Sequence, residues 1–202
     1  MPVFKKIERD DAVVLVWKIE ETLEELKQGV VLETRSSLRL EHMKSIVHQA
    51  GFLAIRHLLK SEGYDDADLY YDANGRPFLA DGKSISITHS FNFAAIIIAD
   101  KLVGIDLEKK RDKILRIASK FCSTSELLTV DASSNAVDTL TEIWCIKEAV
   151  YKMCNSRSLS FKANILTNLP HKVTVKDRAF YKEMNYFTLD FEGFMLVYTF
   201  EK

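Results

Sequence analysis

Cysteine is scarce in this sequence, which holds only Cys122, Cys145 and Cys154 among its 202 residues. Their spacing matches no metal-binding motif, and an odd number of cysteines does not suit a framework of paired disulfides. We therefore interpret all three as packing residues of a protein that works in the reducing cytoplasm.

The sequence also lacks a long apolar segment and a secretion signal. Its longest apolar run, residues 93–99, is far too short to span a bilayer. Near the N-terminus two lysines are followed by Glu8, Asp10 and Asp11, and the apolar run after them is too brief for a signal peptide. We expect neither a membrane span nor export.

No charge of one sign dominates, since 28 Lys and Arg face 29 Asp and Glu. The overall field therefore gives no reason to expect binding to nucleic acid or to an anionic membrane, and any polyanion must be bound locally. With 47% hydrophobic residues, the chain can bury the core of one globular unit or two small ones. We expect a monomer.

Hydrophobic periodicity predicts helices first and strands afterwards, twice along the chain. In the first half, helices are expected at 20–28 and 36–60, the second ending where Gly63 suits a left-handed cap, and strands at 12–19, 68–72, 84–88, 91–99 and 102–108. In the second half, helices are expected near 112–120, from the capping box Ser123–Glu126, and at 138–153, with strands at 172–176, 186–191 and 194–200.

This repeated order predicts an α+β protein of two small subdomains, residues 1–101 and 102–202, packed against each other as one structural unit. No Pro-, Gly- or Ser-rich linker separates the halves. The polar stretch 129–138 is expected to be a mobile loop, and Glu192-Gly193 a hairpin turn between the last two strands.

Three carboxylates and a lysine stand out at two places in the second half. In the strand 103–108 the apolar residues alternate with Asp106 and Glu108, which therefore share one face. On the predicted helix 138–153, Glu148 and Lys152 are four residues apart and project from one face. Three such carboxylates could hold a hard divalent cation, which keeps waters and takes substrate phosphates as further ligands.

Each motif also has a plain structural interpretation. Asp106 and Glu108 could be the solvent-facing side of an edge strand. Glu148 and Lys152 could be an ordinary exposed ion pair, which contributes about 0.3–0.5 kcal/mol.

Two further motifs lie upstream: Gly75-Arg76-Pro77, and Ser-Ile-Ser-Ile-Thr-His-Ser at 84–90. In this order the chain resembles the 4′-phosphopantetheinyl transferases of the larger, single-chain class, the surfactin-synthetase-activating type. Their members carry Gly-(Lys/Arg)-Pro, Ser-His-Ser, Gly-(Ile/Val)-Asp-x-Glu and Trp-x-x-Lys-Glu-(Ala/Ser)-x-x-Lys. The resemblance covers residues 75–155.

The resemblance implies the 4′-phosphopantetheinyl transferase fold, two similar α/β subdomains related by a pseudo-twofold axis. It also implies transfer of the phosphopantetheine arm of coenzyme A to a serine of an apo acyl or peptidyl carrier protein, with release of adenosine 3′,5′-bisphosphate. Asp106, Glu108 and Glu148 would hold Mg²⁺ against the coenzyme A diphosphate. Glu148 would also be the base, and Lys152 would stabilise or protonate the leaving group.

The first subdomain would contact the nucleotide of coenzyme A. There the resemblance implies that His89 and Thr88 bind near the 3′-phosphate and that Arg76 lies near the nucleotide. Otherwise, His89 could be structural, and Arg76 could belong to the Asn-Gly-Arg-Pro turn.

The sequence departs from the family further upstream, where members carry basic residues that grip the 3′-phosphate. Candidates here are Arg35, Arg39 and Lys44, whereas Val47 and His48 stand where the family arginine is expected. The run 109–113 is either a solvated connection or a basic patch for an acidic carrier protein.

Two rival functions differ in class. The chain could be a carrier-protein-binding protein without turnover, although the clustered carboxylates and Lys152 argue against it because like charges repel. It could instead be a metal-dependent nucleotide phosphohydrolase, which would activate a water and need no protein acceptor.

Overall fold

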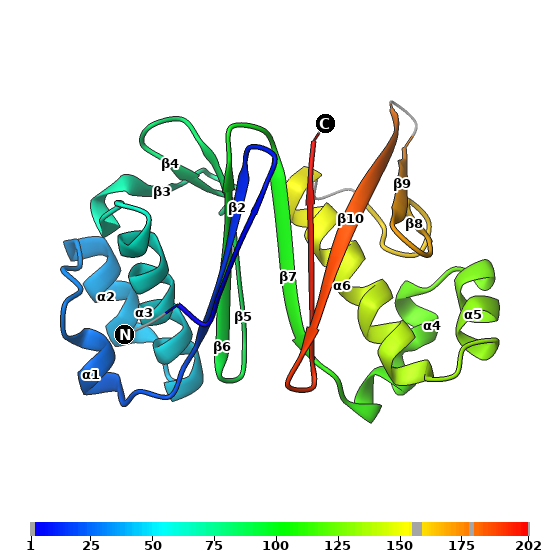
Figure 1. Cartoon of the computed structure of the whole chain (residues 1–202), viewed down its shortest axis with the longest axis horizontal. Coiled ribbons are helices and arrows are strands. Elements are labelled where there is room, and N and C mark those ends of the chain that lie inside the picture. Colours follow the sequence, from blue (N-terminus) through cyan, green and yellow to red (C-terminus); the bar gives the residue numbers. More distant parts are fainter. Residues whose placement is uncertain (1–2, 155–158, 178–179, 202) are drawn as a thin grey trace. The chain divides into compact units, whose positions relative to one another are not determined.

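The computed structural model describes residues 3–154, 159–177 and 180–201 of the chain (Figure 1). The chain divides into two compact units, Met1–Lys101 and Leu102–Lys202. Each unit combines helices with one antiparallel sheet, so the predicted α+β class is confirmed.

The first unit is built on a six-stranded sheet with the order β1-β2-β6-β5-β4-β3. Its strands are β1 (Lys5–Arg9), β2 (Ala12–Lys18), β3 (Leu69–Tyr71), β4 (Pro77–Leu79), β5 (Ser84–Ser90) and β6 (Phe93–Ala99). All seven residues of β6 are buried, as an uninterrupted apolar run indicates. Strands β1 and β4 were not predicted from the sequence: β1 is short and largely exposed, and β4 has only three residues.

Three helices, α1 (Leu23–Lys27), α2 (Thr34–His42) and α3 (Ile46–Ser61), lie on one side of this sheet (Figure 1). The prediction of one helix over 36–60 was wrong, because the backbone becomes extended at Met43 and ends α2 there. Ser45 then caps α3, since its side chain accepts a hydrogen bond from the His48 amide. Gly63 follows α3 with φ +84°, as predicted.

The second unit has a five-stranded sheet with the order β7-β11-β10-β9-β8. Its strands are β7 (Val103–Lys109), β8 (Ile165–Asn168), β9 (Lys172–Lys176), β10 (Tyr181–Phe191) and β11 (Phe194–Phe200). The hairpin turn between β10 and β11 is confirmed, with φ 48° at Glu192 and 76° at Gly193. Only Asp100, Lys101 and Leu102 lie between the end of β6 and the start of β7, yet the two strands belong to different sheets.

The long helix α6 (Ala136–Cys154) packs against β7 and β11 and buries its apolar side there (Figure 1). Before it come the 3₁₀-helix η2 (Asp112–Ile117), α4 (Ala118–Phe121) and α5 (Thr124–Asp131). The capping box Ser123–Glu126 is confirmed at the start of α5. The predicted loop 129–138 was too long, because α5 continues to Asp131 and α6 begins at Ala136.

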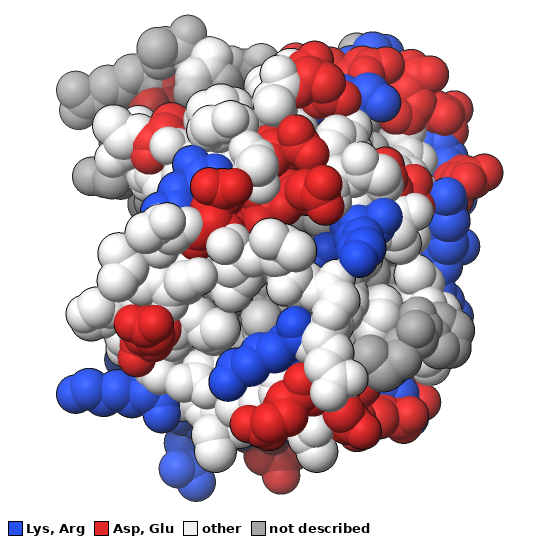
Figure 2. Space-filling model, turned by 90° about the vertical axis from the view of Figure 1, so that its left-hand side faces the viewer, with Lys and Arg blue, Asp and Glu red and all other residues white. Residues whose placement is uncertain are grey.

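On the face shown in Figure 2, acidic side chains gather in the upper half, and Lys and Arg lie beside them and among uncharged residues. None of the helices formed by the described residues is long and apolar enough to cross a membrane.

Candidate functional site

The site in the second unit depends on a close approach between β7 and α6. A Cβ added at Gly104 would lie 1.9 Å from the carbonyl oxygen of Ala149 and 3.0 Å from the Cβ of Met153. Glycine at this position therefore lets the helix backbone rest directly on the strand. This contact brings the face of β7 that carries Asp106 under the part of α6 that carries Glu148 and Lys152.

Asp106 is covered by this helix and is only 4% exposed. Its Oδ1 accepts a hydrogen bond from Lys152 Nζ at 2.7 Å, and Lys152 also donates to the carbonyl oxygen of Ile105 at 3.0 Å. Because α6 covers it, the solvent-facing alternative is wrong for Asp106, while Glu108, further along the strand, is half-buried. Lys152 of α6 pairs with Asp106 of β7, so this ion pair joins the helix to the strand. The alternative, an exposed pair between Lys152 and Glu148 within the helix, is therefore not what forms.

Glu148 is half-buried between these charges. The pKa of its carboxyl group is raised to about 7, mainly by burial and in addition by the negative charges of Asp106 and Glu108, while the positive charge of Lys152 opposes the rise. Asp106 and Glu108 thus lie close enough to Glu148 to raise its pKa, and Glu148 titrates near neutral pH.

Carboxylate oxygens are the ligands that Mg²⁺ prefers, so the chemistry of the donor set fits this ion. In the part of the chain that the structure describes, no group of three or more His, Cys, Asp or Glu is gathered tightly enough to hold a metal ion as it stands. The triad Asp106, Glu108 and Glu148 therefore stays a prediction.

A cavity of about 210 Å³ opens beside Glu108. Its other lining residues come from the basic run, from η2 and from α6: Lys109, Arg111, Lys113, Ile114, Ile117, Thr141 and Trp144. One member of the basic run is tied down, since Lys110 Nζ binds Asp138 of α6 at 2.8 Å and also pairs with Asp190. The basic run 109–113 is therefore not a wholly solvated connection, and not all of its charges are available to an acidic carrier protein.

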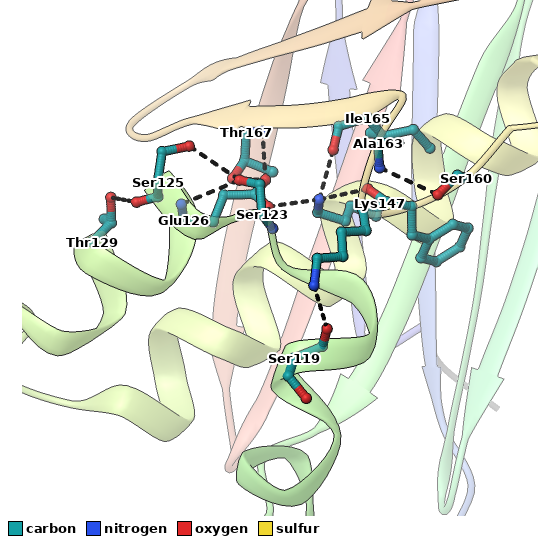
Figure 3. A network of polar contacts seen from close by, with 12 residues as sticks. Ser119, Ser123, Ser125, Glu126, Thr129, Lys147, Ser160, Ala163, Ile165 and Thr167 are labelled. Carbon is teal, nitrogen blue, oxygen red and sulfur yellow. Dashed lines mark hydrogen bonds and ion pairs between the residues drawn. The ribbon is translucent and has the colours of Figure 1, made fainter.

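Sequence reasoning assigned no role to Lys147, which directly precedes Glu148. Its side chain is fully buried and pairs with Glu126 of α5 (Figure 3). The sequence did contain a signal for this buried pair, because Lys147 falls on the apolar stripe of α6 between Ile143 and Val150. A lysine at such a position must find a buried partner, since burial of an unpaired charge is costly.

The candidates of the first unit lie on β5 and on the turn before β4. His89 is exposed and rests on Gly51 of α3, where an added Cβ would lie 2.6 Å from the imidazole Cδ2. The His48 ring lies edge-on to it, with ring centroids 5.4 Å apart. Thr88 is buried and, as the strand neighbour of His89, points to the opposite face of the sheet.

Arg76 is half-buried, and its backbone closes a turn with Asp72: the Arg76 amide donates to Asp72 Oδ1 at 2.9 Å. On α2, the guanidinium groups of Arg35 and Arg39 lie over the rings of Tyr70 and Tyr71, at 4.8 and 5.1 Å from the ring centroids. The faces of the two tyrosine rings attract the positive charges of the guanidinium groups, so both arginines are engaged in cation–π contacts.

Comparison with known proteins gives three findings. Residues 102–192 match the model of the 4′-phosphopantetheinyl transferase superfamily. The 4′-phosphopantetheinyl transferase gsp of Aneurinibacillus migulanus is 30% identical over 80 residues, which are 39% of this chain and about a third, 34%, of that protein. The crystal structure of the Thermotoga maritima holo-[acyl-carrier-protein] synthase is 20% identical, with a TM-score of 0.42, over 50% of this chain and 62% of that one.

Proposed function

We propose that this chain, whose residues 102–192 match the model of the 4′-phosphopantetheinyl transferase superfamily, transfers the 4′-phosphopantetheine arm of coenzyme A to a serine hydroxyl of an apo carrier protein. Adenosine 3′,5′-bisphosphate is the other product. The observation that carries the proposal is Glu148, a half-buried carboxyl whose pKa is raised to about 7, beside the Asp106–Lys152 pair. A general base works best when its pKa lies near the working pH.

The reaction forms one bond and breaks one. The serine oxygen attacks the phosphorus that carries the pantetheine arm, and the bond from that phosphorus to the bridging oxygen of the diphosphate breaks. Glu148 accepts the serine proton, and Lys152, which lies one helical turn away, offers positive charge to the departing bisphosphate.

We include Mg²⁺ in this proposal, with Asp106, Glu108 and Glu148 as the residues that would hold it. The ion supplies charge neutralisation for the diphosphate. The support is the donor set and the mutual influence of the three carboxylates on the pKa of Glu148.

The proposal gives the first unit the nucleotide part of coenzyme A. His89 is an exposed imidazole held against Gly51, which suits a contact with the 3′-phosphate, and Arg76 supplies charge for the nucleotide. Thr88 stays in the proposal because of its place in the motif. We further propose a monomer that acts in the cytoplasm, where the absence of a disulfide at any of the three cysteines is expected.

One assay separates this function from its rivals. The protein is incubated with coenzyme A, Mg²⁺ and an apo acyl or peptidyl carrier protein, and the carrier is then weighed by mass spectrometry. A gain of one phosphopantetheine arm supports the transferase. An unmodified carrier with intact coenzyme A indicates a carrier-binding protein without turnover, and cleaved coenzyme A with an unmodified carrier indicates a phosphohydrolase.

A further inference from the structure

We propose that Lys147 and Glu126, together with Thr167, are positioning residues that hold α6 in place so that Glu148 and Lys152 stay aimed at β7. The inference rests on the proposed function for its kinetic consequences, whereas its effect on cation binding can be measured separately. The three residues define what we call the Lys147 network.

The Lys147 ammonium group uses all three of its hydrogen-bond donors. It donates to Glu126 Oε2 at 2.9 Å, to the carbonyl oxygen of Phe161 at 2.7 Å and to that of Ile165 at 2.6 Å. With one side chain, α6 is thereby joined to α5, to the segment before β8, and to β8 itself (Figure 3).

Glu126 is as well satisfied as its partner. Its Oε1 accepts hydrogen bonds from the amide and the hydroxyl of Thr167, both at 2.8 Å, and its Oε2 also accepts one from the Ser123 amide at 2.7 Å. The carboxylate that completes the capping box of α5 therefore also fixes β8 and α6. The pair is buried, with Lys147 0% and Glu126 3% exposed.

Such a network specifies position more than it adds stability. An apolar pair of the same volume could pack equally well here, because the desolvation of two buried charges offsets most of their attraction. An apolar side chain would, however, tolerate a small slide of the helix. A shift of α6 by one residue, about 1.5 Å along its axis, would disturb the geometry of all three hydrogen bonds of Lys147 at once.

The direction of the two neighbouring side chains makes this position matter for the site. Successive residues of an α-helix project about 100° apart, so Lys147 reaches α5 and β8 while Glu148 faces the charges of β7. On the strand side the helix is set by its contact with Gly104. The Lys147 network is a second anchor, made of polar contacts to α5 and β8, that prevents α6 from turning or sliding.

The test compares the wild-type protein with the double variant Lys147→Met/Glu126→Gln, which removes both buried charges and leaves none unpaired. We expect kcat for transfer to fall by about tenfold or more while KM for coenzyme A changes little, as for residues that orient metal ligands. The affinity for Mn²⁺, measured directly by electron paramagnetic resonance, should weaken by about tenfold for the same reason.

The first unit offers a matched control, the buried pair Arg56–Asp66, which is 2.9 Å long with side chains 4% and 1% exposed. Arg56→Met/Asp66→Asn should change the melting temperature by about as much as the first double variant does, without changing kcat or Mn²⁺ affinity. If the first double variant does not fold, Thr167→Val replaces it, since it removes a single hydrogen bond to Glu126. Its kcat and Mn²⁺ affinity should fall in the same direction by a smaller factor.

A folded double variant, or failing that a folded Thr167→Val variant, with normal kcat and normal Mn²⁺ affinity would overturn the inference. So would a wild-type protein that binds no Mn²⁺, because there would be no site to position. A wild-type protein that binds Mn²⁺ but modifies no carrier would refute the proposed function alone. The comparison of Mn²⁺ affinities would then still decide whether the network positions α6.

Discussion

Two properties distinguish Glu148 from an exposed carboxyl group. It lies beside a buried aspartate and a half-buried glutamate, and its pKa is raised to about 7, first by burial and then by those charges. At neutral pH a large fraction of this group is therefore still protonated, and it can exchange its proton readily.

The first prediction concerns its role in transfer. Glu148→Gln keeps the shape of the side chain and removes the base, so the rate of carrier modification should fall by at least about a hundredfold, with the circular dichroism spectrum unchanged. Glu142→Gln is the matched control. Glu142 is a half-buried carboxyl on the same helix whose raised pKa comes from burial, and it accepts a hydrogen bond from Tyr186. Its variant should keep most of the activity, and normal turnover by Glu148→Gln would exclude the proposed base.

The second prediction concerns stability without divalent cations. The folded state holds the Glu148 proton up to a pKa of about 7, whereas the unfolded chain releases it near 4.5. Between these values the folded state binds more protons, so the contribution of Glu148 to stability falls as pH rises through this window. Glu148→Gln should therefore be more stable than the wild type at pH 8, by on the order of 1 kcal/mol, and equal to it at pH 4. Urea denaturation at both pH values measures this, and an equal difference at both would contradict the raised pKa.

At the scale of elements, the contact between β7 and α6 determines the site. The third prediction is that Gly104→Ala lowers both stability and transfer, because its Cβ would meet the Ala149 carbonyl at 1.9 Å and the helix must move away. We expect a loss of about 1–3 kcal/mol in the free energy of unfolding, as for other overpacked sites.

Gly193→Asn is the control for that variant. Apart from its two neighbours in the chain, no residue comes within 4 Å of an added Cβ at Gly193, and asparagine tolerates its φ of +76°. Its stability and activity should remain close to those of the wild type, and an equal loss in both variants would mean that the close approach at Gly104 is not the cause.

The fourth prediction concerns α3 and β5. Gly51→Ala would place its Cβ 2.6 Å from the His89 ring and displace the imidazole. If His89 binds the 3′-phosphate, both Gly51→Ala and His89→Ala should raise KM for coenzyme A several-fold, about 1 kcal/mol or more, and leave kcat nearly unchanged. An unchanged KM in His89→Ala would identify the histidine as structural.

At the scale of the whole molecule, a net charge of −1 provides almost no long-range attraction for an acidic partner. Any electrostatic help in meeting a carrier protein must come from local groups. Arg111 and Lys113 are exposed beside the cavity at Glu108. Lys110 pairs with Asp138 and Asp190.

The fifth prediction follows from this distribution. Arg111→Ala/Lys113→Ala should raise KM for the carrier protein several-fold and weaken its dependence on salt, because complementary charge mainly accelerates encounter. The control Lys172→Ala/Lys176→Ala removes the same charge from β9 and should change neither quantity. Equal effects in both variants would show that net charge alone matters.

Local patterns predicted much of the fold because they depend on neighbouring residues. The capping box at Ser123, the positive φ at Gly63 and Glu192-Gly193, and the course of β7 follow from short-range sterics and period-two alternation. The short strands β1, β4 and β8 were missed because three to five residues carry too little pattern, and their place in a sheet depends on partners distant in sequence.

The sequence alone predicted which residues would carry the chemistry, since the order of motifs around Asp106, Glu108, Glu148 and Lys152 resembles that of the 4′-phosphopantetheinyl transferases. Only the tertiary structure decided that Asp106 is buried under α6 and that Lys152 crosses to it. The same holds for the pairing of Lys147 with Glu126. The physical reason is that burial and ion pairing depend on which distant segments meet, and local sequence patterns do not encode that meeting.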